Sequence, residues 1–474
     1  MKHQRLTILF TLILFLSPIL TTVPVKASEV NSTWPEGPNV YAEAAIVMEA
    51  STGLILYEKG IHQEYYPASI TKIMTALLAI ENSSLGEVVT FSKNAVFDVD
   101  LDSSRIGIDV GEKLTMQQCL YGILLESANE VSYAVAEHVG GTMEEFVRMM
   151  NDRAQSIGCK NTNFVNPHGL HDTNHYTSAY DMALITREAM KNETFRKIFS
   201  TRTYQIPPTN IQSETRYLRH HHRFILKQQY HYDDCIGGKT GYTSISKFTL
   251  ASVAKRGDLE LICIVMKDDS NEHQYTDTQK LFDYGFDNFS IYTVADMETE
   301  QALSESPMFT RYNSLLSEDK SPITTDKNGY LILPNTAAFE DAKKEVTFYN
   351  SAEEAAENDA GTVTEGKVLG KISYTYNNKY VGGAYILYHA LDTPKLIHKE
   401  PIAKNPTSDS KDPFKIQSDK SLRPIILGGI IGLIVLLFCL YFIFIERPRL
   451  KRRSAYYRKR ALRKRYKDDD FLDL

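Results

Sequence analysis

Residues 41–293 alternate short β-like apolar runs with longer runs of helical spacing. The β-like runs are 41–50, 53–60, 248–256 and 259–267. Between them, apolar residues recur every three or four positions, as on the buried face of a helix. The helical runs are 70–81, 115–140, 142–158 and 178–191. Strands at both ends with helices between them predict an α+β layer arrangement for a domain at 28–293.

Residues 294–393 have a different pattern. Four runs there are short, alternating and aromatic, with Asn-Asn and Gly-Gly turn signals among them: 329–334, 344–349, 368–376 and 379–390. This pattern predicts a smaller, mostly β domain. Residues 394–423 lack hydrophobic periodicity and carry Pro, Ser and charge, which indicates a linker or stalk.

The N-terminal segment has the pattern of a secretory signal peptide. Lys2 and Arg5 precede an apolar run at 6–20, and small residues at Val25 and Ala27 follow. We expect cleavage after Ala27, so residues 1–27 are the signal peptide. The alternative is an uncleaved anchor.

A second apolar segment, 424–445, carries no charge and is long enough to cross a hydrocarbon core as a helix. The tail after it, 446–474, has twelve Lys or Arg against five Asp or Glu. The positive-inside rule places such a tail in the cytoplasm. We therefore expect a single-pass protein of the cell membrane, with residues 28–423 outside the cytoplasm.

Splitting the charge by segment argues against nucleic acid as a partner. The signal peptide carries +3 and the tail +7, so the net charge of −6 leaves about −16 for the exported part. The basic tail could be an RNA-binding arm, but a juxtamembrane cluster near anionic lipid is the commoner explanation. Outside the membrane segment four cysteines remain, which allow two disulfides but show no zinc-type spacing: Cys119, Cys159, Cys235 and Cys263.

The motif S-x-x-K occurs five times, at Ser69, Ser244, Ser252, Ser317 and Ser408, so the motif alone indicates little. Only Ser69 opens a helical run, where a spacing of three puts Ser69 and Lys72 on one face. The structural reading is an N-cap serine followed by a solvated lysine. The catalytic reading requires Lys72 to be buried and neutral, so that it can take the Ser69 proton.

Two further motifs favour the catalytic reading. S-x-N occurs at Ser127 and Asn129, and also at Ser92, whereas K-T-G occurs once, at 239–241. In this order, S-x-x-K, S-x-N and K-T-G resemble the fingerprint of penicillin-recognising serine acyltransferases. With similar stretches at 111–142 and 162–190, the exported part resembles a low-molecular-mass penicillin-binding protein of the serine-type D-alanyl-D-alanine carboxypeptidase family.

The resemblance implies a role for each motif residue. Ser69 is the nucleophile on the bond between two D-alanines, and Lys72 is its base, with a pKa lowered by burial and by Lys239. Ser127 relays the proton to the leaving amine, and Asn129 positions Lys72 and the substrate. Lys239 and Thr240 bind the substrate carboxylate, and Gly241 lets the K-T-G strand approach the substrate backbone closely. The backbone N–H groups of Ser69 and Tyr242 form the oxyanion hole.

The expected partners are therefore a peptidoglycan stem peptide ending in D-Ala-D-Ala, β-lactams as covalent inhibitors and the membrane, with no cofactor. Two stretches depart from the family pattern: 235–238, just before K-T-G, and 219–224. The residue that binds the substrate carboxylate is therefore left open. The latter stretch holds His220, His221 and His222; three consecutive histidines cannot all face one ion, so no metal is expected.

Three alternatives remain open at this stage. A β-lactamase would need a deacylating base, typically Glu, and residues 161–181 contain none. A non-catalytic wall-binding sensor would have no use for an activated Ser69. An endopeptidase or transpeptidase would use the same acyl-serine chemistry with a different substrate or acceptor.

Overall fold

The computed structural model describes residues 34–100, 102–298, 323–349 and 367–388. The predicted signal peptide, linker, membrane segment and tail (1–27, 394–423, 424–445 and 446–474) lie outside the described residues. Among the helices that are described, none combines the length and apolar character needed to span a membrane.

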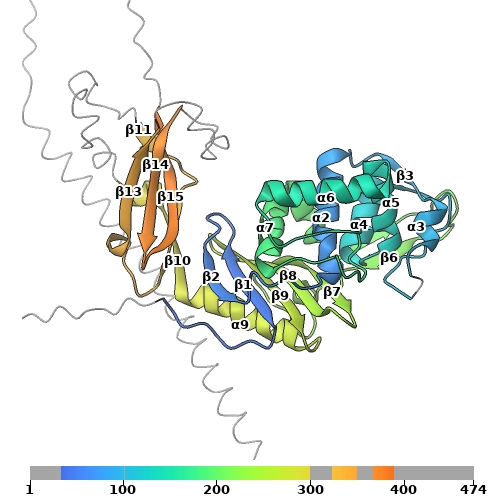
Figure 1. Cartoon of the computed structure of the whole chain (residues 1–474), viewed down its shortest axis with the longest axis horizontal. Coiled ribbons are helices and arrows are strands. Elements are labelled where there is room, and N and C mark those ends of the chain that lie inside the picture. Colours follow the sequence, from blue (N-terminus) through green and yellow to red (C-terminus); the bar gives the residue numbers. More distant parts are fainter. Residues whose placement is uncertain (1–33, 101, 299–322, 350–366, 389–474) are drawn as a thin grey trace, which may run out of the picture. The chain divides into compact units, whose positions relative to one another are not determined.

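A five-stranded antiparallel sheet forms the centre of the first domain, in the order β2-β1-β9-β8-β7 (Figure 1). Its strands are β1 (Ala44–Glu49), β2 (Ile55–Lys59), β7 (Cys235–Thr243), β8 (Lys247–Arg256) and β9 (Leu259–Asp268). All six residues of β1 are buried. Alternate β1 residues face two separate apolar clusters, because both faces of the sheet are covered.

Helices cover the two faces of this sheet (Figure 1). α9 packs on β8 and β9, and α7 packs on β9 and β1. The helices are α2 (Lys72–Asn82), α3 (Lys93–Phe97), α4 (Met116–Leu125), α5 (Asn129–Gly140), α6 (Met143–Ile157), α7 (Ala179–Met190), α8 (Glu193–Phe199), α9 (His273–Asn288) and α10 (Val294–Met297). The predicted α+β arrangement is confirmed, although the sequence pattern did not identify α9.

The helical run predicted at 115–140 is interrupted in the structure. α4 ends at Leu125 and α5 begins at Asn129. Between them, Ser127 has a φ of 61°, in the left-handed region. A non-glycine residue in this region costs of order 1–3 kcal/mol, and such strain often marks a functional position.

Two small two-stranded sheets flank the helices, pairing β3 with β4 and β5 with β6. Their strands are β3 (Val88–Thr90), β4 (Lys113–Thr115), β5 (Thr203–Ile206) and β6 (Arg216–Arg219). The loop after β6 runs back toward the central sheet, where His222 contacts Ser252 of β8.

A second, six-stranded sheet has the order β10-β12-β15-β14-β13, with β11 also paired to β15. Its strands are β10 (Phe289–Thr293), β11 (Ile323–Thr325), β12 (Tyr330–Pro334), β13 (Lys343–Phe348), β14 (Lys367–Tyr376) and β15 (Lys379–Tyr388). β10 precedes residue 294, where the sequence analysis placed the start of the β domain. The domain boundaries themselves stay predictions.

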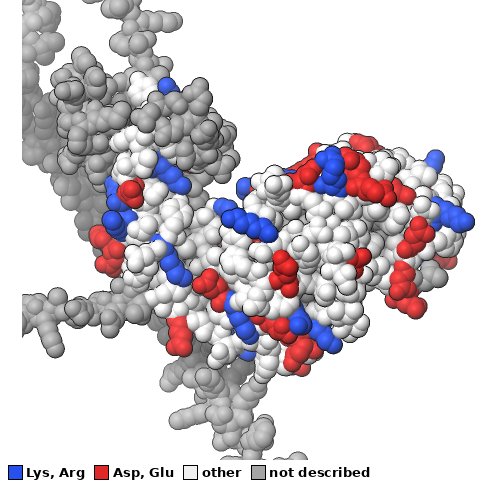
Figure 2. All heavy atoms as spheres, in the orientation of Figure 1, with Lys and Arg blue, Asp and Glu red and all other residues white. Residues whose placement is uncertain are grey.

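The surface chemistry of the described residues is ordinary. On the face drawn in Figure 2, acidic and basic side chains are interspersed, and no basic stripe of the kind that binds nucleic acid is seen there. The four described cysteines are all free thiols. The two disulfides that the sequence allowed are therefore not formed in this structure.

Candidate active site

Ser69 lies in a 3-10 turn, η1 (Ala68–Thr71), that leads directly into α2. Ala68 before it has a φ of 50°. The Thr71 hydroxyl donates to the Ala68 carbonyl oxygen at 2.8 Å and holds this bend. Gly169 packs against the same carbonyl: a Cβ there would lie 1.8 Å from the Ala68 oxygen, so only glycine fits. The turn therefore presents Ser69 at a backbone position that surrounding contacts hold in place.

Lys72 is fully buried at the first position of α2. Its Nζ lies 3.0 Å from Ser69 Oγ, 2.5 Å from Asn129 Oδ1 and 2.6 Å from the carbonyl oxygen of His168. Burial lowers the pKa of Lys72 well below its usual value, the nearby Lys239 lowers this pKa further, and Glu130 opposes the shift. Lys72 is therefore not the solvated lysine of the structural reading.

These three contacts of Lys72 suit both of its protonation states. A charged ammonium has three N–H groups for three acceptors. A neutral amine donates its two N–H groups to Asn129 and His168 and turns its lone pair to the Ser69 hydroxyl. Lys72 can thus accept the Ser69 proton without moving, which is what a general base requires.

Ser127 and Lys239 form a second buried pair beside the first. Lys239 Nζ donates to Ser127 Oγ at 3.0 Å and to the Thr240 carbonyl oxygen at 2.7 Å. Ser127 is 3% exposed and Lys239 is 1% exposed. Burial lowers the pKa of Lys239 to about 7. The break between α4 and α5 therefore delivers the Ser127 hydroxyl to a lysine that can give or take a proton near neutral pH.

Gly241 brings β7 against the nucleophile turn. A Cβ at this position would lie 2.3 Å from Thr249 Oγ1 and 2.9 Å from the backbone nitrogen of Ser69. The sequence analysis expected the glycine to admit the substrate backbone. In the structure, its close neighbours are Thr249 and Ser69, so the glycine is needed to set the Ser69 amide beside the Gly241–Tyr242 backbone.

A cleft of about 420 Å³ is lined by five of the motif residues: Ser69, Ser127, Thr240, Gly241 and Tyr242. The other three motif residues are buried and do not line it: Lys72, Asn129 and Lys239. The cleft also includes residues to which the sequence analysis gave no role: Ser104, His221, Arg223, Phe248, Asn271, Gln274 and Tyr275. No motif marks these residues, because they come from loops, from β8 and from α9, which only the fold brings together.

Arg223 is the guanidinium in this lining. Its Cζ lies 5.7 Å from the ring centroids of both Tyr230 and Tyr275, which stack against it and limit its movement. Its charge faces the same cleft as Ser69 and Thr240. An anionic group of a bound ligand would therefore meet a fixed positive charge here.

The histidines have structural contacts. His175 is 1% exposed, accepts the Val165 N–H at Nδ1 and contacts Thr71 Oγ1 through Nε2, so it braces the turn that holds Ser69. His222 Nε2 contacts Ser252 Oγ at 2.7 Å, and the backbone N–H of His222 donates to His220 Nδ1. The rings of His220 and His222 lie 6.2 Å apart and nearly perpendicular.

Comparison with known proteins identifies the family of this chain. The sequence profile of Peptidase S11, D-alanyl-D-alanine carboxypeptidase, matches residues 31–270. The chain belongs to this D-alanyl-D-alanine carboxypeptidase family. It is 34% identical over 253 residues to D-alanyl-D-alanine carboxypeptidase DacF of Bacillus subtilis, covering 53% of this chain and 64% of DacF. The chain thus spans just under two thirds of the length of that relative.

Two solved structures extend the comparison. Penicillin-binding protein 5 of Haemophilus influenzae matches over 75% of this chain and 98% of its own, with a TM-score of 0.57 and 24% identity, which shows the shared fold. The DD-transpeptidase of Streptomyces K15 is 30% identical and matches over 53% of this chain and 100% of its own, with a TM-score of 0.51. The resemblance to low-molecular-mass penicillin-binding proteins found in the sequence is confirmed.

Proposed function

We propose that this chain removes the terminal D-alanine from peptidoglycan stem peptides through an acyl-enzyme on Ser69. The observation that carries this proposal is the buried Lys72, whose Nζ lies 3.0 Å from Ser69 Oγ. Membership of the D-alanyl-D-alanine carboxypeptidase family supplies the substrate class.

In the first step Ser69 Oγ attacks the carbonyl carbon between the two D-alanines, while its proton passes to Lys72 Nζ. Negative charge develops on the carbonyl oxygen, where the backbone N–H groups of Ser69 and Tyr242 stabilise it. The helix that begins at Lys72 adds the positive potential of its N-terminus.

In the second step the C–N bond breaks and the leaving amine takes a proton. Ser127 supplies it and is itself reprotonated from Lys239, whose Nζ lies 3.0 Å away. D-Alanine departs, and water then attacks the carbonyl carbon of the ester on Ser69. The water proton passes through Ser127 to Lys239, and Lys72 returns its proton to Ser69 Oγ as the ester bond breaks, so that the serine and a shortened peptide are released.

The substrate carboxylate requires a positive partner in the cleft. Thr240 and Lys239 are the residues that the family resemblance implies. Arg223 lines the same cleft and carries a planar guanidinium, which can bind a carboxylate through two parallel hydrogen bonds. We assign the carboxylate to Thr240 and Arg223 together, with Lys239 free to serve Ser127.

A β-lactam ring imitates the scissile amide, so the same steps acylate Ser69 with the antibiotic. A transpeptidase would pass the acyl group to an amine instead of water, and one of the similar solved structures is that of a DD-transpeptidase. The cleft geometry described above serves either acceptor.

We further propose that residues 28–423 act outside the cytoplasm, held by a membrane helix at 424–445 after removal of 1–27. The uncharged run and the basic tail support this arrangement. Protease treatment of intact cells should degrade the catalytic part and spare residues 446–474. Protection of the catalytic part would contradict the proposal.

The activity is tested with the purified full chain and a synthetic pentapeptide ending in D-Ala-D-Ala. D-Alanine and a tetrapeptide should appear in equal amounts, and Ser69→Ala should release neither. Release of D-alanine with an added amine incorporated in its place would indicate a transpeptidase. Binding of the peptide without any release would favour the wall-binding sensor.

A further inference from the structure

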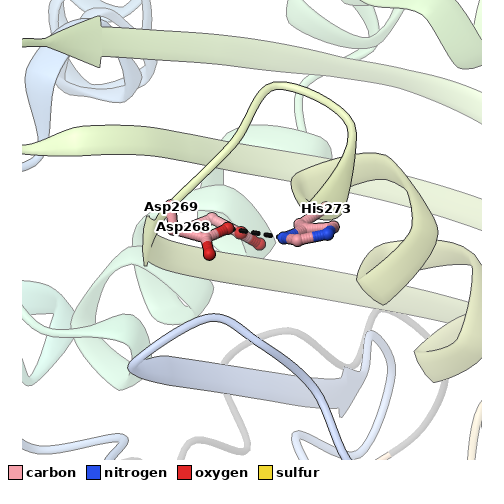
Figure 3. Close-up of side chains that lie close together, drawn as sticks. All are labelled: Asp268, Asp269 and His273. Carbon is pink, nitrogen blue, oxygen red and sulfur yellow. Dashed lines mark hydrogen bonds and ion pairs between the residues drawn. The ribbon is translucent and has the colours of Figure 1, made fainter.

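A second polar cluster, outside the acyl-transfer chemistry, lies where β9 ends and α9 begins. It consists of Asp268, Asp269 and His273, drawn in Figure 3 with an imidazole facing a carboxylate. One ligand atom from each residue lies within 4.8 Å of the other two. His273 Nδ1 is 2.5 Å from Asp269 Oδ1.

Asp268 is the unusual member of this cluster. It is fully buried, and neither of its carboxylate oxygens has a hydrogen-bond partner. Burial and the charge of Asp277 raise the pKa of Asp268 to about 7, and the nearby Ser270 N–H lowers this pKa only in part. Buried polar groups in native proteins are nearly always paired, because an unpaired buried carboxylate is costly. We therefore expect a ligand from outside the protein chain to bind the Asp268 carboxylate.

The charges around Asp268 are mostly negative. Asp269 and Asp277 both act on it electrostatically, and His273 is the cation partner among its interactions. Asp277 is already satisfied by the N–H groups of Tyr41 and Ala42. The nearby lysines are engaged elsewhere: Lys267 pairs with Glu43 at 3.0 Å, and Lys280 lies 3.4 Å from Asp277. A positive charge at Asp268 would correct this imbalance.

We propose that Asp268, Asp269 and His273 bind one divalent transition-metal ion of the Zn²⁺ type. One imidazole nitrogen and two carboxylate oxygens are ligands that zinc accepts at about 2.0–2.2 Å. Ligand atoms on a tetrahedral ion of this kind lie roughly 3.5 Å apart, so a pair as far apart as 4.8 Å has to close by about 1.3 Å on binding. The imidazole suits zinc better than Mg²⁺ or Ca²⁺, which prefer oxygen ligands alone.

The site is open to solvent on one side, and its imidazole ring is held in a fixed orientation. The side chains of Asp269 and His273 are 69% and 31% exposed, so an ion can enter from solvent and keep water on its open side. The His273 ring stacks on Tyr41, with centroids 3.8 Å apart and planes 7° from parallel, which fixes the imidazole plane. The ion would replace the hydrogen bond that now joins His273 to Asp269.

The site borders the cleft without entering it. Asn271 lies in the loop between Asp269 and His273, and Gln274 follows in α9; both line the cleft that holds Ser69. A bound ion would fix the ends of this loop. The ion is therefore structural, and the acyl-transfer steps do not pass through it.

The test is calorimetric titration of ZnCl₂ into the chelator-treated full chain. We expect one binding event that weakens at least tenfold in Asp268→Asn and in His273→Gln. The matched control is His231→Gln, since His231 also faces an aspartate, Asp233, at 3.1 Å, but without a buried third carboxylate. This control should retain the full affinity. Far-ultraviolet circular dichroism of each variant checks that the fold is kept.

Thermal unfolding provides the second readout. Zn²⁺ at a hundredfold excess over its dissociation constant should raise the Tm of the parent and of His231→Gln, and should leave that of His273→Gln unchanged. Identical isotherms for all four proteins, or equal loss in His231→Gln, would overturn the proposal. In that case Asp268 is held as a neutral carboxylic acid.

Discussion

The turn at Ser69 and strand β8 carry the same S-x-x-K motif, at 69–72 and 252–255, with opposite outcomes. In the turn, the two side chains meet at 3.0 Å and Lys72 is buried. In the strand, Ser252 is buried against His222, while Lys255 is exposed. A spacing of three puts side chains on one face of a helix but on opposite faces of a strand. The backbone, and not the motif, brings the lysine into contact with the serine.

Burial also separates the two lysines. Desolvation lowers the pKa of Lys72, so that its neutral form becomes accessible, whereas Lys255 remains in water. The third S-x-x-K motif among the described residues begins at Ser244, in the turn after β7, and ends at Lys247, the first residue of β8. Ser244 and Lys247 are both exposed. Among the described S-x-x-K motifs, only the one at Ser69 has a buried lysine in contact with its serine.

The largest effect should come from Lys72→Ala compared with Lys255→Ala. Loss of a general base costs about 10²–10⁴ in rate, so acylation of Ser69 by a β-lactam should slow by that factor in the first variant. Lys255→Ala should keep the parent rate within about twofold, because an exposed side chain is changed. Stopped-flow acylation kinetics measure both. Equal rates in the two variants would contradict a role for Lys72 as the base.

Ser127→Ala should have the next largest effect. Without its hydroxyl, Lys239 has no route to the leaving amine, and we expect kcat for D-alanine release to fall about 10²-fold. Ser252→Ala is the matched control, since it loses a buried hydroxyl that contacts His222. This control should lose roughly 1 kcal/mol of unfolding free energy and keep its kcat. A normal kcat in Ser127→Ala would remove Ser127 from the mechanism.

The pH dependence sharpens the contrast between a buried and a solvated lysine. Lys72 acts as a base only when neutral, so the acylation rate should rise tenfold per pH unit below its pKa and level off above it. Because burial lowers that pKa well below 10.5, the plateau should begin at a correspondingly lower pH. Lys72→Arg, which stays charged, should remain inactive throughout. A rate that keeps rising up to pH 10.5 would indicate a solvated base.

The smallest of these effects concerns Arg223→Gln. Loss of a charged partner for the substrate carboxylate should raise KM for a D-Ala-D-Ala peptide about tenfold, with kcat nearly unchanged. A peptide whose C-terminus is a carboxamide serves as the control, because its binding should not change. Equal effects on both peptides would show that Arg223 only supports the cleft through its contacts with Tyr230 and Tyr275.

The α+β class was predicted from local spacing, and the motif residues were predicted from their resemblance to a known family. The sequence did not predict the break at Ser127, since apolar periodicity runs on through 115–140 and the left-handed residue has no sequence signature. Nor did it identify Arg223, the His168 carbonyl or Asp268. Arg223 and the His168 carbonyl acquire their roles from contacts between segments far apart in the chain, and Asp268 acquires its role from its burial; no local pattern records either property.

The central claim is that Ser69 is an activated nucleophile. Its most direct test is incubation of the full chain with a β-lactam, followed by intact mass over time and peptide mapping, with Ser69→Ala alongside. We predict an adduct of one antibiotic per chain that maps to Ser69 and is absent from the variant. Rapid drug turnover without an adduct would indicate a β-lactamase. A folded chain with no adduct and no turnover would contradict the acyl-enzyme mechanism.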